Sequence, residues 1–458
     1  MQRSKIKEIL GRESAGGDVL VQGWVKTRRS SKAVSFVQVS DGSTLADIQV
    51  VADESLPNFQ AVDALTTGCS VSVIGTLVES PGKGQKYEIH AKSIEVVGES
   101  DPDTYPLQKK RHTVEFLRDI AHLRPRTNTF GAMARVRNAL AYAIHGFFQD
   151  KGFLFLQAPM ITASDAEGAG AMFRVTTLDL ENVPMKDGAV NAEEDFFGKP
   201  TFLTVSGQLE AEIFALALSD VYTFGPTFRA ENSNTSRHLA EFWMVEPEVA
   251  FCDLDGLADL SEEFLKHIFT YVLDHCQEDM GFFNQYFDKT AISTLEGIVT
   301  SDFERLTYTE AVDILQRSGK SFEFPVVWGS DLQSEHERYL AETKIGKPII
   351  VTDYPKEIKA FYMRLNEDGK TARALDVLVP RIGEIIGGNE RVSIVKILKA
   401  GHIWRKGSNA QIQYAVEKAV DEIVWQLKRV ARPIGIIANT TPLLGLLGTV
   451  IGIIQAFD

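Results

Sequence analysis

Residues 222–248 constrain the fold more than any other part of the sequence. They read as an apolar strand, a polar loop and a second apolar strand, a pattern that predicts an antiparallel hairpin. Arg229 and Glu231 end the first strand, and Phe242 and Glu246 lie on the second. Arginine supplies a fixed fork of donors to phosphate or carbonyl oxygens. Such a hairpin suits a site that binds a triphosphate and an amine together.

The polar loop of this hairpin adds Arg237 and His238, and Phe242 offers an aromatic face on which a base can stack. The whole hairpin resembles motif 2 of the class II aminoacyl-tRNA synthetases, in the wording of asparaginyl-tRNA synthetases. An ordinary charged hairpin on an unrelated sheet is the alternative. The resemblance implies that Arg229 and Glu231 are the catalytic residues. The ATP-binding residues that it implies are Arg229, Glu231, Arg237, His238, Phe242 and Glu384.

Composition places few limits on this interpretation. With 458 residues the chain can hold two or three domains with substantial cores. The formal net charge of -14 argues against a general nucleic-acid binder, yet it leaves room for a local basic patch facing tRNA. The three cysteines show no metal spacing and no disulfide framework, and the first residues form no apolar signal region. We therefore expect a cytoplasmic protein.

Residues 1–105 predict a small β-barrel. Five short apolar or alternating stretches are separated by turn signals, a pattern typical of an OB-fold. The segment Gln22–Arg29, followed by Phe36 and Gln49, resembles the anticodon-binding barrel of class IIb synthetases. The resemblance implies that Phe36 stacks on an anticodon base of tRNA(Asn), while Gln49 and Glu88 hydrogen-bond to base edges. Alternatively, Phe36 is a core residue and Gln49 is ordinary surface.

A linker at residues 106–130 leads into the predicted catalytic domain, residues 131–391. Between residues 133 and 149 apolar side chains recur at helical spacing, and a short strand that ends at Pro159 follows. This helix and strand resemble motif 1 of the class II synthetases. Because motif 1 builds the subunit interface in that family, the resemblance implies a homodimer.

Two segments before the hairpin concern the amino acid that the site accepts. The resemblance places Glu167, in a flexible acidic loop, near the substrate ammonium. Where aspartyl relatives carry a lysine for the substrate carboxylate, the aligned residue here is Ala211, flanked by Glu210 and Glu212. A carboxylate accepts from an amide but repels aspartate, so this arrangement favours asparagine; at least one of the two glutamates is expected to be plain helix surface. The amino-acid-binding residues implied are Glu167, Ser206, Gln208, Glu210, Glu212, Glu246 and Arg391.

Asp376 and Glu384 predict a metal site. Both fall on buried strands near the run Gly383–Gly388, whose wording matches the synthetase family closely. Mg²⁺ prefers oxygen ligands and keeps phosphate oxygens in its shell. We therefore expect these two carboxylates to hold Mg²⁺ beside ATP.

Beyond Arg391 the synthetase pattern ends. The family continues into motif 3, a glycine-rich strand and helix whose arginine contacts ATP, but no Gly-x-Gly-x-Gly-x-x-Arg run follows. Residues 408–427 predict an amphipathic helix, and residues 433–457 are uncharged over a length that can span a bilayer. The uncharged run resembles the second membrane helix of TolQ/ExbB-type proton-channel subunits. Residues 392–458 therefore read as a foreign helical tail capable of membrane contact, or alternatively as a buried helix that replaces motif 3.

The abrupt change beside Arg391 leads to the hypothesis that the join is a cloning, assembly or recombination artefact rather than an evolved fusion. The motif 3 arginine is one of two cationic clamps on the ATP phosphates in the family. Because this clamp and part of the floor of the ATP site are missing, we expect the chain to be nearly inactive.

The predicted fold class is α+β, with a five-stranded OB-fold barrel, the antiparallel-sheet catalytic domain of class II synthetases, and the helical tail. The implied activity is that of an asparagine–tRNA ligase that uses ATP and Mg²⁺. Three alternatives remain: an aspartate-charging or dual-specificity ligase, a synthetase-like enzyme that makes asparagine without tRNA, and a catalytically dead tRNA-binding or membrane-tethered protein. The barrel argues against the second alternative, since that reaction has no anticodon to read.

Overall fold

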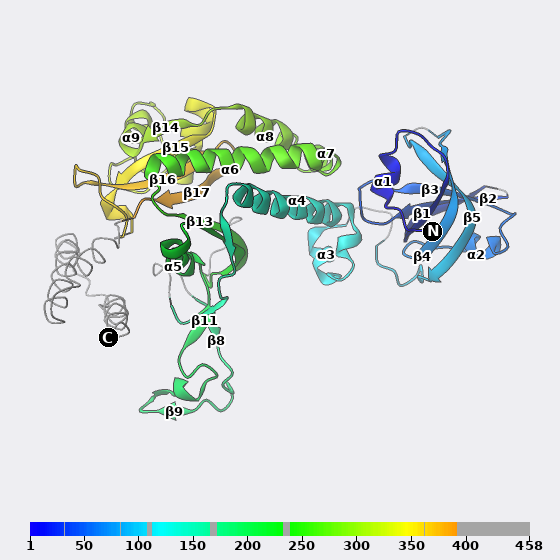
Figure 1. Cartoon of the computed structure of the whole chain (residues 1–458), viewed down its shortest axis with the longest axis horizontal. Helices are drawn as coiled ribbons and strands as arrows, with labels where there is room; N and C mark the ends of the chain where they lie inside the picture. The colour runs from blue at the N-terminus through cyan, green and yellow to red at the C-terminus, as the bar shows by residue number, and fades with distance from the viewer. Residues whose placement is uncertain are drawn as a thin grey trace. The chain divides into compact units, whose positions relative to one another are not determined.

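The chain folds into two compact units in the computed structural model (Figure 1). Met1–Phe251 and Asp259–Asp302 make up the first unit, while Cys252–Ala258 and the chain from Phe303 onward make up the second. Each unit has its own strands. The structure describes residues 1–31, 33–82, 84–107, 112–164, 172–231, 239–360 and 362–391.

The first unit begins with a closed barrel whose strand order is β1-β2-β3-β5-β4. Side chains along β2 and β4 alternate between the apolar interior and the outer face, because successive residues of a strand point to opposite sides. Strands β3 and β5 pair in parallel, and the other neighbours pair antiparallel. The predicted five-stranded OB-fold barrel is confirmed. Its elements are α1 (Ile6–Leu10), β1 (Asp18–Ser31), β2 (Val34–Ser40), β3 (Ile48–Asp53), α2 (Phe59–Asp63), β4 (Ser70–Glu79) and β5 (Tyr87–Gly98).

The rest of the first unit is built around one long helix and a three-stranded sheet. Thr127 caps the long helix, since its Oγ1 accepts a hydrogen bond from the Phe130 N–H at 3.4 Å. The stretch 106–130, predicted as a linker, contains two short helices, α3 and η1. The helices of this part are α3 (Val114–Asp119), η1 (Arg124–Arg126), α4 (Asn128–Asp150), η2 (Ala192–Glu194), α5 (Gln208–Leu218), α6 (Leu254–His275), α7 (Gln277–Tyr286) and α8 (Ala291–Thr300).

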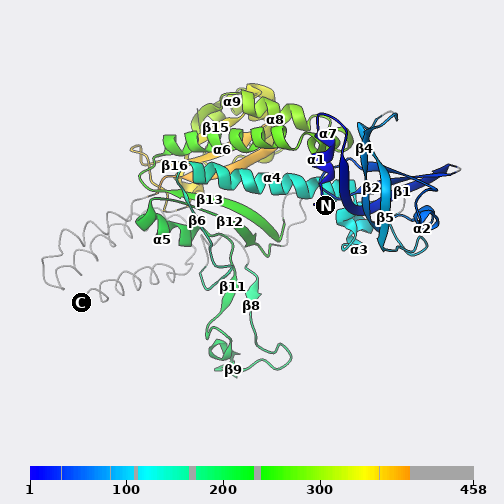
Figure 2. The same cartoon turned by 45° about the vertical axis from the view of Figure 1, so that its right-hand side comes forward.

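The sheet has the order β13-β12-β6 and contains the hairpin that residues 222–248 predict. Strands β12 and β13 pair antiparallel along their whole length, and β6 joins β12 in parallel. An extension that carries β8, β9 and β11 projects from this region in both views (Figures 1 and 2). The strands are β6 (Leu154–Leu156), β7 (Ile161–Thr162), β8 (Arg174–Val175), β9 (Met185–Lys186), β10 (Ala189–Val190), β11 (Thr201–Leu203), β12 (Asp220–Phe228) and β13 (Glu241–Val249).

The second unit is a four-stranded sheet in the order β14-β15-β16-β17 with its own apolar core. Strand β14 is parallel to β15, whereas β15, β16 and β17 run antiparallel to one another. The predicted α+β class is therefore confirmed. The elements are β14 (Glu304–Thr307), α9 (Tyr308–Gln316), α10 (Ser334–Arg338), the π-helical turn η3 (Tyr339–Ile345), β15 (Ile349–Pro355), η4 (Lys356–Ile358), β16 (Thr371–Val379) and β17 (Gly383–Asn389).

Within the described part of the chain, no helix has both the length and the apolar character needed to cross a membrane. The helix predicted at 408–427 and the bilayer-length run predicted at 433–457 both lie outside the described residues.

Candidate functional site

The hairpin holds Arg229 directly after β12, opposite the start of β13. The backbone N–H of Arg229 donates to the Ala240 carbonyl at 3.0 Å, and its guanidinium carbon lies 5.3 Å from the centre of the Phe242 ring. Its Nε is buried and has no hydrogen-bond partner among the described residues. Because a buried cationic donor without a partner is costly, this nitrogen is well suited to an anionic ligand.

Glu246, on β13, is fixed by groups from three segments. Its Oε2 accepts from the Gly207 N–H at 3.0 Å and from Thr223 Oγ1 at 2.9 Å, and its Oε1 accepts from Ser206 Oγ. Ser206 Oγ in turn accepts from the N–H of Gln208, the first residue of α5, at 3.1 Å. The structure therefore brings together Ser206, Gln208 and Glu246, three of the predicted amino-acid-binding residues.

Helix geometry separates the two candidate glutamates on α5. Gln208 Nε2 donates to Glu212 Oε1 at 3.3 Å, because residues four apart share one face of a helix. Glu210, two positions after Gln208, lies on a different face. Glu212 is thus the glutamate on the Gln208 side of the helix.

In the second unit, Asp376 on β16 and Glu384 on β17 both approach Gly387. A methyl group built at Gly387 would lie 3.4 Å from Glu384 Oε1 and 3.5 Å from Asp376 Oδ1. Lys359 Nζ forms an ion pair with Asp376 Oδ2 at 3.0 Å. Surrounding protein atoms, followed by the charge of Asp376, raise the pKa of Glu384 to about 7, although Glu384 lies on the exposed side of its strand. Two mutually repelling carboxylates fit an oxygen-liganded divalent cation.

The other predicted residues of the active site are placed only in part. Arg391 packs its guanidinium 5.0 Å from the Tyr362 ring centre in the second unit. Glu231 lies just after the hairpin's first strand. Glu167, Arg237 and His238 lie outside the described residues.

The outer face of the barrel carries a polar platform built from two cross-strand rows. Phe36, Val51 and His90 are direct neighbours in one row, and Gln38, Gln49 and Glu88 are direct neighbours in the other. Phe36 faces outward and is half-buried, while Val37 and Val39 between these rows fill the core. The name barrel platform is used below for Phe36, Gln38, Gln49, Val51, Glu88 and His90.

Glu88 is the centre of the hydrogen bonding on the barrel platform. Its Oε2 accepts from Gln49 Nε2 at 3.0 Å, Ser80 Oγ at 2.9 Å and Gln85 Nε2 at 3.2 Å. His90 Nε2 lies 3.1 Å from Glu88 Oε1. Both Gln49 and Glu88 are less than one-tenth exposed, so the alternative that Gln49 is ordinary surface is not what the structure shows. The sequence signal for Gln38 and His90 was their period-two spacing from Phe36 and Glu88.

Comparison with known proteins assigns the chain to a class. Residues 113–421 match the family described as tRNA synthetases class II (D, K and N), and residues 19–97 match an OB-fold nucleic acid binding domain. The protein therefore belongs to the class II aminoacyl-tRNA synthetases.

Individual relatives identify the group within that class. The chain is 60% identical over 397 residues to an asparagine–tRNA ligase from Picosynechococcus, which covers 86% of each sequence. It is 59% identical over 401 residues to an asparagine–tRNA ligase from Nostoc, which covers 87% of each sequence. Within the class, the chain is a member of the asparagine–tRNA ligase family.

Solved structures and the tail complete the comparison. The fold is similar to the asparaginyl-tRNA synthetase from Pyrococcus horikoshii complexed with asparaginyl-adenylate, with a TM-score of 0.72 and 27% identity over 94% of this chain and 96% of that one. Residues 390–458 match the MotA/TolQ/ExbB proton channel family, which confirms the predicted resemblance of the tail. The two family matches overlap at residues 390–421, so the synthetase similarity extends past Arg391, where the sequence motifs end.

Proposed function

We propose that this chain activates asparagine with ATP and transfers the asparaginyl group to tRNA(Asn). The observation that carries the proposal is the hairpin, which presents a buried Arg229 Nε without a partner and a fixed Glu246 carboxylate on paired strands. One group suits the phosphates of ATP and the other suits the α-amino group of an amino acid.

In the proposed first step, the carboxylate of asparagine attacks the α-phosphorus of ATP and pyrophosphate leaves. Arg229 stabilises the negative charge that develops on the phosphoryl oxygens, and Phe242 stacks on the adenine ring. Glu231, Arg237 and His238 complete the ATP-binding residues. The adenylate then passes to the terminal ribose of tRNA, a transfer that depends on positioning more than on a side-chain base.

Mg²⁺ is the metal that the second unit would hold, through Asp376 and Glu384. The support is the donor set, since two carboxylates that both approach Gly387 repel each other in the absence of a cation. When bound, Mg²⁺ neutralises charge on phosphate oxygens. Lys359 keeps Asp376 ionised and oriented.

Asparagine recognition falls to the groups around the start of α5. Glu246 accepts from the α-amino group, and Glu212 or Glu210 accepts from the side-chain amide, with Glu212 favoured by its contact with Gln208. The remaining amino-acid-binding residues in the proposal are Glu167, Ser206, Gln208 and Arg391.

The barrel platform is the proposed anticodon site. Phe36 offers a ring for base stacking, and Gln49 and Glu88 offer donors and acceptors for base edges. The Glu88 network supports this role, since it holds the Gln49 amide in one orientation before any RNA arrives.

A homodimer through α4 and β6 is part of the proposal. Four large apolar side chains on these elements are exposed in the single chain: Met133, Tyr142, Leu154 and Phe155. Burial against a second copy would remove this apolar surface from water. We place the protein in the cytoplasm, with membrane contact only through residues 433–457.

Activity below that of complete relatives follows from the sequence after Arg391. Loss of one preorganised charge contact typically lowers a rate by a factor of about 100 to 1,000. The second candidate, a catalytically dead tRNA-binding or membrane-tethered protein, is favoured by one observation, the proton-channel match at residues 390–458. The hypothesis of an artefactual join would be contradicted by the same uninterrupted reading frame in independent clones of the source DNA.

The test is amino-acid-dependent ATP–pyrophosphate exchange on the full chain and on a graft whose residues 392–458 are replaced by the matching segment of the Picosynechococcus relative. We expect exchange with asparagine and none with aspartate, at least about 100-fold faster in the graft. Arg229→Ala in the graft should abolish the gain. A graft that exchanges no faster than the chain contradicts the proposal, and exchange with aspartate contradicts the specificity.

A further inference from the structure

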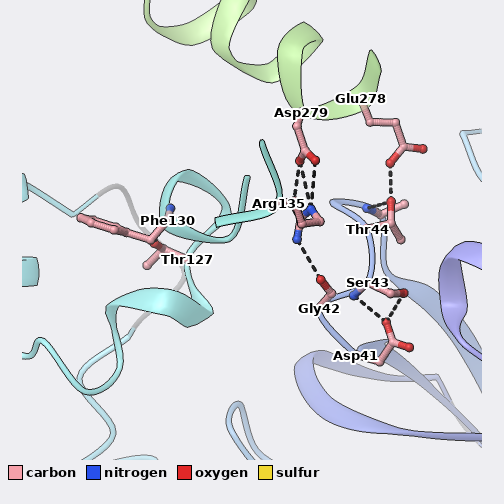
Figure 3. A network of polar contacts seen from close by, with 10 residues as sticks. Asp41, Gly42, Ser43, Thr44, Thr127, Phe130, Arg135, Glu278 and Asp279 are labelled. Atoms are coloured by element: carbon pink, nitrogen blue, oxygen red, sulfur yellow. Dashed lines mark hydrogen bonds and ion pairs between the residues drawn. The ribbon is translucent and has the colours of Figure 1, made fainter. Parts of the chain in front are cut away.

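One arginine of the long helix joins three separate segments of the first unit (Figure 3). Arg135, on α4, donates from Nε and Nη2 to the carboxylate of Asp279 on α7, at 2.7 to 3.2 Å. Its Nη1 donates to the Gly42 carbonyl at 2.9 Å, in the barrel loop between β2 and β3. Because the guanidinium fork is planar and rigid, these contacts fix direction as well as distance.

The barrel loop is itself held in shape. The Asp41 carboxylate accepts from the backbone N–H groups of Ser43 and Ile6, both at 3.0 Å. Thr44 is buried and donates from Oγ1 to the Glu278 carboxylate on α7. The loop therefore meets α7 through Glu278 and meets Arg135 through Gly42, as Figure 3 shows.

A second set of contacts joins the barrel to the segment before α4. The β1–β2 register shifts between Val25 and Thr27, so Lys26 is an extra residue whose side chain is re-aimed by the bulge. Lys26 Nζ donates to the Arg126 carbonyl at 2.8 Å. Burial lowers the pKa of the Lys26 ammonium, and the charge of Asp47 opposes this shift.

Arg126 adds aromatic contacts to this second set. Its guanidinium lies 5.4 Å from the centre of the Trp24 ring and 6.0 Å from that of Tyr105. A simple tether between two domains needs none of these ordered, partly buried charges. Buried ion pairs add little net stability, but a broken pair leaves an uncompensated charge and so disfavours other arrangements.

We infer that Arg135 is a positioning residue for tRNA, which locks the anticodon-type barrel to α4 and α7 so that one RNA can contact both at once. The inference rests on the proposed function only in naming tRNA as the ligand. Strand β2, which carries Phe36 and Gln38, runs directly into the locked loop. When two binding surfaces are held in a fixed relation, the second contact becomes intramolecular, and affinity rises without any new contact.

The experiment compares the full chain with Arg135→Ala and with Arg137→Ala, an exposed arginine of the same helix that serves as a matched control. Affinity is measured by fluorescence anisotropy for whole tRNA(Asn) and for its isolated anticodon hairpin. Arg135→Ala should weaken whole-tRNA binding by about tenfold or more and leave hairpin binding unchanged. An equal loss for both RNAs, or no loss for either, overturns the inference.

A readout without RNA separates this inference from the proposed function. Amide hydrogen exchange at Ser43, Thr44 and the first turn of α7 should be faster in Arg135→Ala than in the parent chain or Arg137→Ala. Unchanged exchange overturns the lock whatever the RNA result. If the parent chain binds neither RNA, the proposed function fails, and exchange alone then decides whether the lock exists.

Discussion

Arg229 and Glu246 occupy opposite hydrogen-bonding states within one hairpin. Glu246 accepts from Ser206, Gly207 and Thr223, whereas Arg229 Nε has no partner among the described residues. A satisfied carboxylate is held in one place, and an unsatisfied buried donor keeps its hydrogen bond for a ligand. At the scale of the residue, the site is thus half rigid framework and half available chemistry.

Glu384 predicts a pH-dependent stability and metal affinity. Its pKa is raised to about 7, above its model value of 4.5, so the folded protein binds this proton more tightly than the unfolded chain does. Stability without metal should therefore fall as pH rises from about 4.5 to about 7 and then level off. Glu384→Gln should remove this fall in urea unfolding series across that range.

Metal binding should show the opposite trend with pH. Because cation binding needs both carboxylates ionised, Mn²⁺ should bind more tightly above pH 7 than below it in the parent chain. Mn²⁺ binding followed by electron paramagnetic resonance checks this. Equal affinity on both sides of pH 7 would contradict the assignment of Asp376 and Glu384.

Glu212 and Glu210 form a matched pair for testing amino-acid recognition. A hydrogen bond to a charged acceptor contributes about 1.5 to 3 kcal/mol, so Glu212→Gln should weaken asparagine binding by about tenfold or more. Glu210→Gln should leave it unchanged. Titration calorimetry with asparagine measures both, and a larger loss in Glu210→Gln would reverse the assignment.

At the scale of the element, strands were easier to predict than the segment between domains. Alternating apolar residues predicted the barrel, and the two apolar runs around a polar loop predicted β12 and β13. Residues 106–130 contain α3 and η1 although their composition suggested a linker. Short helices of this kind depend on caps such as Thr113, whose Oγ1 accepts from the Phe116 N–H at 3.2 Å.

Helix α9 offers a stability test of a capping box. Thr307 Oγ1 accepts from the Glu310 N–H at 3.2 Å, and Glu310 Oε2 accepts from the Thr307 N–H at 2.8 Å. Thr307→Ala should lower the free energy of unfolding of the second unit by about 1 kcal/mol. Thr307→Ser keeps the hydroxyl and should behave like the parent chain in hydrogen exchange of α9 amides. Equal exchange in the alanine and serine variants would contradict the cap's contribution.

At the scale of the whole molecule, exposed apolar surface on α4 and β6 bears on assembly. Tyr142 is 68% exposed in the single chain. If a second copy covers it, Tyr142→Glu should place a charge in that interface and yield monomers by analytical ultracentrifugation. Val97→Glu, at an exposed apolar position on β5 of the barrel, is the control and should leave the parent's state unchanged. A monomeric parent chain would contradict the dimer.

The sequence by itself determined the barrel, the hairpin and the family, because these depend on local alternation and on runs of residues that stay together along the chain. It also marked the change of character after Arg391. Only the tertiary structure decided that Gln49 and Glu88 share a buried network and that Arg135 reaches Asp279, 144 positions away. Contacts at such separation depend on how the chain closes its loops and packs its elements, and no local pattern records that path.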